Sequence, residues 1–420
     1  MTVSRALSRA GVAAGIALLA ALFWLRYANV LAGLETRFVD FAPLHGTLLL
    51  NELADTRLNA WILAWVERAA VTAPALYLDG SVFVANIQEP APNTLAGCAH
   101  LFGVVAQLLP AIPFTDSAVA LHQLALAGST ALLMLTTGLA VHWITRSAWA
   151  ALVAAGFALG MPWRITELSH LQLSSAQLLP LVWVLVARGM LGETRALALL
   201  ALGTLVALQM LSSFYLAYFL SLSTAVVLAG VALVHRPRTR DVVRLGASAL
   251  PGVVLLGLSA LPYLARQANA DLASQYDPDF SLGFGGAWSV IAPRWPHWPA
   301  GSPDGWVLWN QPGNYWTPWD VMVLAGVGAA LGLRARDDVR VRACALALAL
   351  VVATSVVMMV GGSLDVAGVR VPMPAQLLGW VVPGFSLLRG ASRWGILAAV
   401  ALPMLAGIGV AALDRVVRER

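Results

Sequence analysis

The chain has 420 residues, of which 59% are hydrophobic and only 11% are charged. Because soluble domains carry about 25% charged residues, this composition excludes a water-soluble protein. The formal net charge is +5 and every basic residue is Arg; the arginines flank apolar segments, which explains the charge without a nucleic-acid partner. The two cysteines are too few to build a metal site from cysteine.

Apolar blocks recur along the chain, many of them about 17–25 residues long, the length that a helix needs to cross a bilayer. A helix satisfies its own backbone hydrogen bonds in lipid, and the abundant Ala, Leu, Val and Gly favour helices over a β-barrel. We therefore predict an all-α, polytopic integral membrane protein in which 1–420 form one domain of about ten transmembrane helices. The predicted spans are 11–31, 118–141, 148–162, 175–191, 196–211, 214–234, 246–264, 319–333, 343–361 and 393–413.

The first span follows Arg5 and Arg9 and lacks a small-x-small cleavage site, so we predict that it is retained rather than removed as a signal peptide. The segment 375–388 is also apolar, but it is short and contains Pro383 and Gly384. If it does not cross, one side of the membrane receives 16 Arg and 6 acidic residues, and the other side receives 10 Arg and 15 acidic residues. The positive-inside rule then predicts ten spans with both termini in the cytoplasm.

This topology places the long irregular segments on the extracytoplasmic side. They are a large first loop (32–117), a Trp-rich loop (265–318) and an extracytoplasmic or interfacial segment (362–392). The Trp-rich loop fits either a lid that stacks on sugar rings or an aromatic belt that anchors the loop at the membrane surface. Because binding and catalytic residues concentrate on long loops, we expect the function on this face.

The first outer loop contains a polar run followed by an apolar one. From Leu58 onward, apolar residues at 58, 61, 62, 65 and 66 predict a juxtamembrane helix with one apolar face. Asp55 precedes these residues, and it fits either a helix N-cap or a general base acting on a sugar hydroxyl. Asp40 and Glu52 are the reserve candidates for the base.

The run from Asp55 to Trp65 resembles the D-x-x-L-N-x-W-x-L-A-W run of bacterial membrane glycosyltransferase-like proteins of the GT-C superfamily. Several later runs resemble the same family in the same order: 83–86, 92–96, 160–164, 170–175, 208–215 and 383–394. The resemblance covers most of the chain. It implies a catalytic acid on a large first loop, a polyprenyl-phosphate sugar donor, and inversion at the anomeric carbon. The acceptor would be a glycan, a lipid or a protein, and the active site would face the periplasm from a bacterial inner membrane.

This resemblance predicts a division of roles. Asp55 takes the proton of the acceptor hydroxyl while that oxygen attacks C1 of the donor sugar, and the leaving lipid phosphate requires fixed cations. Arginine suits this role because its planar fork binds phosphate oxygens in pairs. The predicted substrate-binding residues are Arg57, Arg164, His100, His170, Arg389 and Arg393. Interfacial snorkelling explains the pair Arg389 and Arg393 equally well, and structural hydrogen bonding is the more common role of such histidines.

No metal is expected, because no His-x-x-x-His spacing occurs, and the lipid-linked sugar would be a co-substrate rather than a cofactor. Two alternatives stay open. The chain reads Gly-Cys-Ala-His at 97–100, where the family usually has Ser-Glu-His, and it lacks a second family Glu near 314–320, so a non-catalytic relative is one alternative. A transporter or flippase of a lipid-linked substrate is the other, although the predicted spans contain few of the charged residues that line such paths.

Overall fold

A computed structural model describes residues 2–35, 49–72, 102–110, 114–167, 170–193, 195–269, 317–385, 388 and 390–419, and these residues are mostly helical. The helices are α1 (Thr2–Ala32), α3 (Leu49–Thr72), α4 (Phe102–Leu108), α5 (Ala118–Thr145), α6 (Ala148–Gly160), α7 (Trp163–Thr166), α8 (Leu171–Ser174), α9 (Leu179–Met190), α10 (Ala196–Ser212), α11 (Phe214–Val234), α12 (Thr239–Asn269), α14 (Trp319–Leu333), α15 (Val339–Met359), α16 (Pro374–Val381), the 3-10 helix η8 (Ala391–Trp394) and α17 (Gly395–Glu419). Two short strands, β1 (Ser363–Val366) and β2 (Val369–Pro372), precede α16.

The described helices confirm a polytopic, helical membrane protein. Among these residues, seven segments are long and apolar enough to cross a bilayer: Ala10–Ala28, Ala118–Thr145, Leu171–Met190, Phe214–Val234, Thr239–Leu261, Val339–Met359 and Ala391–Glu419. Three apolar helices are shorter, namely α6, α10 and α14, with 13, 17 and 15 residues. Each of the ten predicted spans therefore coincides with a helix.

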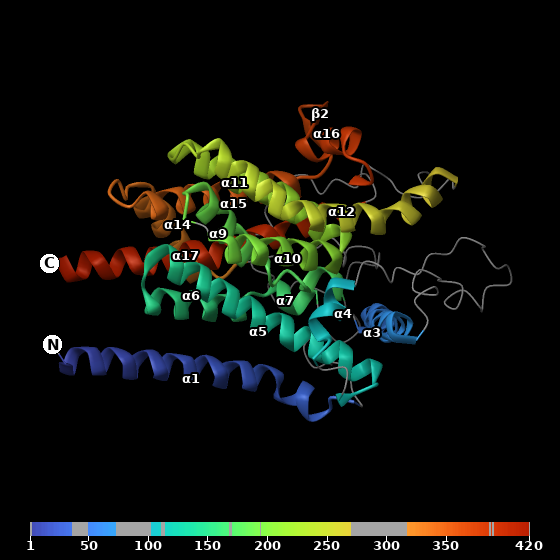
Figure 1. Cartoon of the computed structure of the whole chain (residues 1–420), viewed down its shortest axis with the longest axis horizontal. Helices are drawn as coiled ribbons and strands as arrows, with labels where there is room; N and C mark the ends of the chain where they lie inside the picture. The colour runs from blue at the N-terminus through green and yellow to red at the C-terminus, as the bar shows by residue number, and fades with distance from the viewer. Residues whose placement is uncertain are drawn as a thin grey trace.

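The helices form an elongated bundle whose two termini lie at the same end (Figure 1). The helices α3 and α4 lie at the opposite end, to which α12 and α5 also extend (Figure 1). We call these the termini end and the α3 end. The connectors α5–α6, α9–α10, α11–α12 and α14–α15 lie at the termini end, and the segments around α7 and α8 lie nearer the α3 end.

The helix α17 is one of the two most buried apolar segments of the bundle, together with Leu171–Met190. In its apolar stretch 83% of the residues are buried inside the protein, whereas in α1 only 6% are buried. α17 packs against α14, α15, α6 and α5. The helix α1 therefore lies at the periphery of the bundle, and the described residues leave most of its surface uncovered.

Small residues allow close helix contacts, as is common where helices associate in lipid. A Cβ atom on Gly328 of α14 would lie 1.9 Å from the carbonyl oxygen of Leu405 in α17, and one on Gly409 would lie 2.2 Å from the carbonyl oxygen of Leu324. The helices α10 and α12 pack in the same way, because a Cβ on Gly203 would lie 2.3 Å from the carbonyl oxygen of Ser248.

The segment after α15 contains a β-hairpin that the all-α prediction did not anticipate. β1 pairs with β2 in antiparallel register, and the two turn residues, Ala367 and Gly368, have φ values of 53° and 81°. Two consecutive left-handed residues define the type I′ turn, whose twist matches that of a hairpin. The helix α16 that follows has eight residues and spans about 12 Å, too short to cross about 30 Å of hydrocarbon. The interpretation of 375–388 as non-crossing agrees with this length.

Candidate functional site

The helix α3 packs into the bundle through its apolar face. Ile62, Leu63 and Val66 are buried in a cluster with residues of α4 and α5 and with Leu171 of α8. Trp61 and Trp65 are half-buried at the side of this cluster, and their rings stack with centroids 5.9 Å apart. A helix is thus present over the predicted segment, but it begins at Leu49 rather than near residue 58, and its apolar residues pack against protein.

The two acidic candidates Glu52 and Asp55 lie within α3, and their side chains are outside the described part of the structure. Because the helix begins at Leu49, Asp55 is in its second turn, so the N-cap interpretation does not apply. Residue 55 precedes Asn59 by one turn. Thr56 and Asn59 are both buried, with 9% and 3% of their surface exposed, so polar side chains of α3 face the protein in this turn.

The predicted substrate-binding residues differ in how much of them the structure describes. Arg57 is exposed on α3. Asp40, His100 and Arg389 lie outside the described residues. The side chains of Arg164, His170 and Arg393 are described, and each has specific partners.

Arg164 is held in the interior between α5 and the segment that leads to α9. Its guanidinium is 1% exposed and donates hydrogen bonds to the carbonyl oxygens of Ser174 and Leu126 and to the hydroxyls of Ser129 (2.6 Å) and Thr130. Thr130 in turn shares a hydrogen bond of 2.6 Å with the hydroxyl of Tyr27 in α1. Burial lowers the pKa of Arg164 to about 10, so the group stays cationic at neutral pH. In this conformation its bonds tie the segment 164–174 to α5.

That segment carries a buried carboxylate–imidazole pair. Nδ1 of His170 lies 3.0 Å from Oε2 of Glu167, and the two side chains are 10% and 7% exposed. The backbone N–H of His170 donates to the carbonyl oxygen of Glu167 at 3.2 Å, so the pair is fixed by a local turn. The next residue, Leu171, packs in the same cluster as Ile62 and Leu63 of α3. Both α3 and α8 contact α5, so the pair and the helix that bears Asp55 have α5 as a common neighbour.

Arg393 lies at the start of α17, where the chain turns through Gly390, whose φ is 72°. Nη1 of Arg393 donates a hydrogen bond of 2.6 Å to the hydroxyl of Tyr215, and the guanidinium stands 4.9 Å from the centre of that ring. Tyr215 belongs to the first turn of α11, and α11 also contacts α8. The start of α11 thus has the Arg393 segment and the α8 segment as neighbours.

The structure adds residues that the sequence interpretation did not use. One is Glu167, whose spacing of three residues from His170 is the one that brings side chains together on a helical turn. No local sequence pattern indicated the other three residues. Thr130 accepts from Arg164, Tyr27 bonds to Thr130, and Tyr215 accepts from Arg393, and each contact joins residues far apart in the chain.

A further acid of α3 lies near the first turn of α5. Burial raises the pKa of the Glu67 carboxyl, and the neighbouring charge of Asp116 raises it further. Within the described ranges, His, Cys, Asp and Glu side chains do not gather in groups of three or more. Glu67 and Asp116 are thus a pair of interacting carboxyls near α3.

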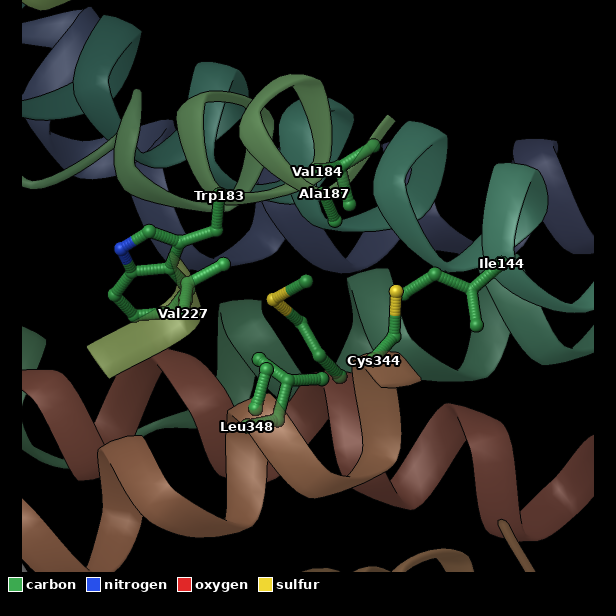
Figure 2. Close-up of a pocket in the computed structure, with 9 residues that line it drawn as sticks. Ile144, Trp183, Val184, Ala187, Val227, Cys344 and Leu348 are labelled. Carbon is green, nitrogen blue, oxygen red and sulfur yellow. The ribbon is translucent and has the colours of Figure 1, made fainter. Parts of the chain in front are cut away.

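A small cavity lies between α5, α9, α11, α15 and α17, and its lining is apolar (Figure 2). Figure 2 shows Trp183, Cys344 and Leu348 around it. The indole N–H of Trp183 donates to Ser223 at 3.0 Å, so this polar atom is already bonded. This cavity offers no polar route through the bundle.

Fold and site together define a multi-pass α-helical membrane protein in which Arg164, Glu167 and His170 are buried polar groups on the segment between α6 and α9. No family model, no curated protein and no solved structure matches the chain. Its function is therefore inferred from its own residues.

Proposed function

We propose that this protein is a membrane glycosyltransferase of the GT-C type, which moves a sugar from a polyprenyl-phosphate donor to an extracytoplasmic acceptor with inversion. The observation that carries the proposal is the packing of α3, which bears Asp55, on α5, the helix that also contacts α8 next to the buried pair of Glu167 and His170. Arg393 supports it, because this cation is held near the start of α11, which also contacts α8. An acid and a cation near one end of the bundle are what a sugar-phosphate donor requires.

In the proposed reaction, Asp55 accepts the proton of the acceptor hydroxyl as the hydroxyl oxygen forms a bond to C1 of the sugar. The bond from C1 to the phosphate oxygen breaks, and its electron pair stays on the lipid phosphate. Arg393 stabilises that charge, and exposed Arg57 is a second cation on α3. His170, held by Glu167, orients the substrate through its imidazole. Arg164 keeps the segment of this pair in place.

The proposal includes ten membrane crossings with both termini in the cytoplasm of a bacterial cell. Seven crossings, an odd number, would place the termini on opposite sides of the membrane, whereas both termini lie at one end of the bundle (Figure 1). Adding α6, α10 and α14 gives an even number. The α3 end then faces the periplasm, where the lipid-linked donor and a glycan, lipid or protein acceptor would meet.

Transport of a lipid-linked substrate is less well supported. A transporter needs polar or charged groups along a path through the membrane. The cavity in Figure 2 is apolar, and the buried ionic groups described above lie toward the α3 end.

The decisive experiment replaces Asp55 by Asn and follows the glycans of cells that make normal amounts of the protein. Loss of a general base costs about 10²–10⁴-fold in rate, so we expect the product to fall to the level of a deletion strain. The matched control is Asp320→Asn, an exposed acid in the first turn of α14, which we expect to leave the product unchanged. Normal glycans in Asp55→Asn, with a clear loss on deletion, would remove Asp55 from this role. Unchanged glycans on deletion would favour the non-catalytic alternative.

A further inference from the structure

We propose a second binding site, at the termini end of the bundle, in which Arg188 of α9 and Arg340 of α15 bind a phosphate group around Trp143 of α5. The expected source of this phosphate is the headgroup of an anionic lipid in the adjacent leaflet. The site lies at the end opposite α3, and it does not rest on the proposed transferase activity.

The two guanidiniums share one aromatic ring. The central carbon of Arg188 and that of Arg340 each lie 5.5 Å from the centre of the Trp143 ring, and the indole is 7% exposed. The three residues come from three different helices, so the packing of α5, α9 and α15 brings the two cations together. Stacking on an indole fixes the plane of each guanidinium and leaves its N–H edges for other partners.

The hydrogen-bond donors of the two arginines are not equally satisfied. Arg340 donates from Nε to the carbonyl oxygen of Ile144 at 3.1 Å and has Asp338 at 3.5 Å. Asp338 is shared, because its other oxygen accepts the N–H of Val341 at the start of α15. A second acid, Glu193, follows α9 and, like Asp338, acts on the nearby thiol of Cys344. The side chain of Arg188 has no ion pair or hydrogen bond with the described residues, and its Nε is buried without an acceptor. The acceptor that this guanidinium lacks is what an anionic headgroup held between helices supplies.

The apolar cavity fixes how deep the anion can lie. Ile144 and Ala187, the chain neighbours of Trp143 and Arg188, line this cavity together with Cys344, one turn beyond Arg340 (Figure 2). A phosphate placed there would lose its hydration without gaining a hydrogen bond. The anion is thus confined to the level of the two arginines, where the chain connectors α9–α10 and α14–α15 also lie.

The test measures lipid-dependent thermal stabilisation of the purified full-length protein in detergent. Phosphatidylglycerol, phosphatidylcholine and inorganic phosphate are titrated separately, because a ligand that binds only the folded state raises the melting temperature in proportion to its occupancy. We expect phosphatidylglycerol to stabilise more than phosphatidylcholine. Arg188→Gln should bind phosphatidylglycerol about tenfold more weakly, since a charge-assisted pair is lost. The matched control is Arg195→Gln, an exposed arginine at the same end, which should bind as the original protein does.

A second variant, Arg188→Lys, separates a specific site from general attraction. It keeps the charge and loses the planar fork, so we expect weaker binding than in the original protein while the melting temperature without lipid stays near normal. This variant decides the question if Arg188→Gln does not fold. If inorganic phosphate saturates the site and prevents phosphatidylglycerol from binding, the ligand of the site is a soluble phosphate rather than a lipid headgroup. The proposed site would be wrong if phosphatidylglycerol and phosphatidylcholine raised the melting temperature equally. It would also be wrong if Arg188→Gln and Arg195→Gln weakened phosphatidylglycerol binding equally.

Discussion

Arg164 shows how a single cation can be buried near the membrane without an acidic partner among the described residues. Its charge is met by two backbone carbonyls and two hydroxyls, which lie on α5 and on the segment before α9. A charged group buried without such acceptors would cost several kcal/mol. The arrangement makes Arg164 a connector between elements, whereas Arg393 keeps part of its surface exposed.

We predict that Arg164→Met destabilises the folded protein by about 2 kcal/mol, because buried acceptors lose their donor. Tyr27 should also be held less firmly, since its partner Thr130 belongs to the same network. Denaturation of the purified protein in mixed detergent measures this loss. Arg238→Met removes an exposed arginine and should change stability little; equal losses in both variants would contradict the structural role of Arg164.

The sequence indicates the polar residues of the α3 end better than it indicates their partners. Arg164, His170 and Arg393 stand out because polar groups are rare beside apolar spans. Their contacts do not stand out, because Tyr215 and Arg393 are separated by 178 residues and meet only when α11 and α17 pack. Glu167 and His170 are three residues apart, so for this pair the spacing in the sequence does indicate the contact.

At the scale of elements, glycine decides which helices approach most closely. Gly328 and Gly409 place the backbones of α14 and α17 in direct contact, and a side chain at either position would meet a carbonyl oxygen of the other helix. In lipid, such contact replaces the hydrophobic driving force that holds soluble helices together.

We predict that Gly328→Ala destabilises the bundle by about 1–3 kcal/mol, because the added methyl group forces the two backbones apart. Gly326→Ala is the matched control on the same helix, where an added Cβ meets nothing within 4 Å. It should be neutral or slightly stabilising, since alanine favours a helix. Thermal unfolding of both variants checks this, and similar melting temperatures would show that α14 and α17 have room to separate.

The helices were predictable at this scale, and the hairpin was not. A membrane-spanning helix is recognised in a sequence because it needs a run of about 20 mostly apolar residues. β1 and β2 have four residues each, and the alternation of Val366, Val369 and Val371 is too short to separate a strand from a loop. Only the adjacent left-handed pair, Ala367 and Gly368, makes the turn of a hairpin.

For the whole molecule, the hydropathy of each segment predicted where the apolar helices lie, but their mutual arrangement depends on contacts that no local pattern records. The burial of α17 and the exposure of α1 illustrate this, because both are apolar segments near a terminus. Their composition is similar, and only the packed bundle distinguishes them.

We predict that single cysteines at Ala367 and Arg336 lie on opposite sides of the membrane, in a protein whose Cys98 and Cys344 have been replaced. Ala367 is exposed in the hairpin turn, and Arg336 is exposed between α14 and α15. A membrane-impermeant thiol reagent should label Ala367→Cys in intact cells and Arg336→Cys only after permeabilisation. If the reagent labels both cysteines from the same side, α15 does not cross the membrane between them.

The central position of α17 has a consequence for how the protein is made. A ribosome makes this helix after α5, α6, α14 and α15, so these helices enter the membrane before the segment against which they finally pack exists. During synthesis, Gly328 and the other small residues that later contact α17 face lipid or the insertion machinery. Chains that stop before residue 395 would lack part of the interior of the bundle, and we expect quality-control proteases to degrade them.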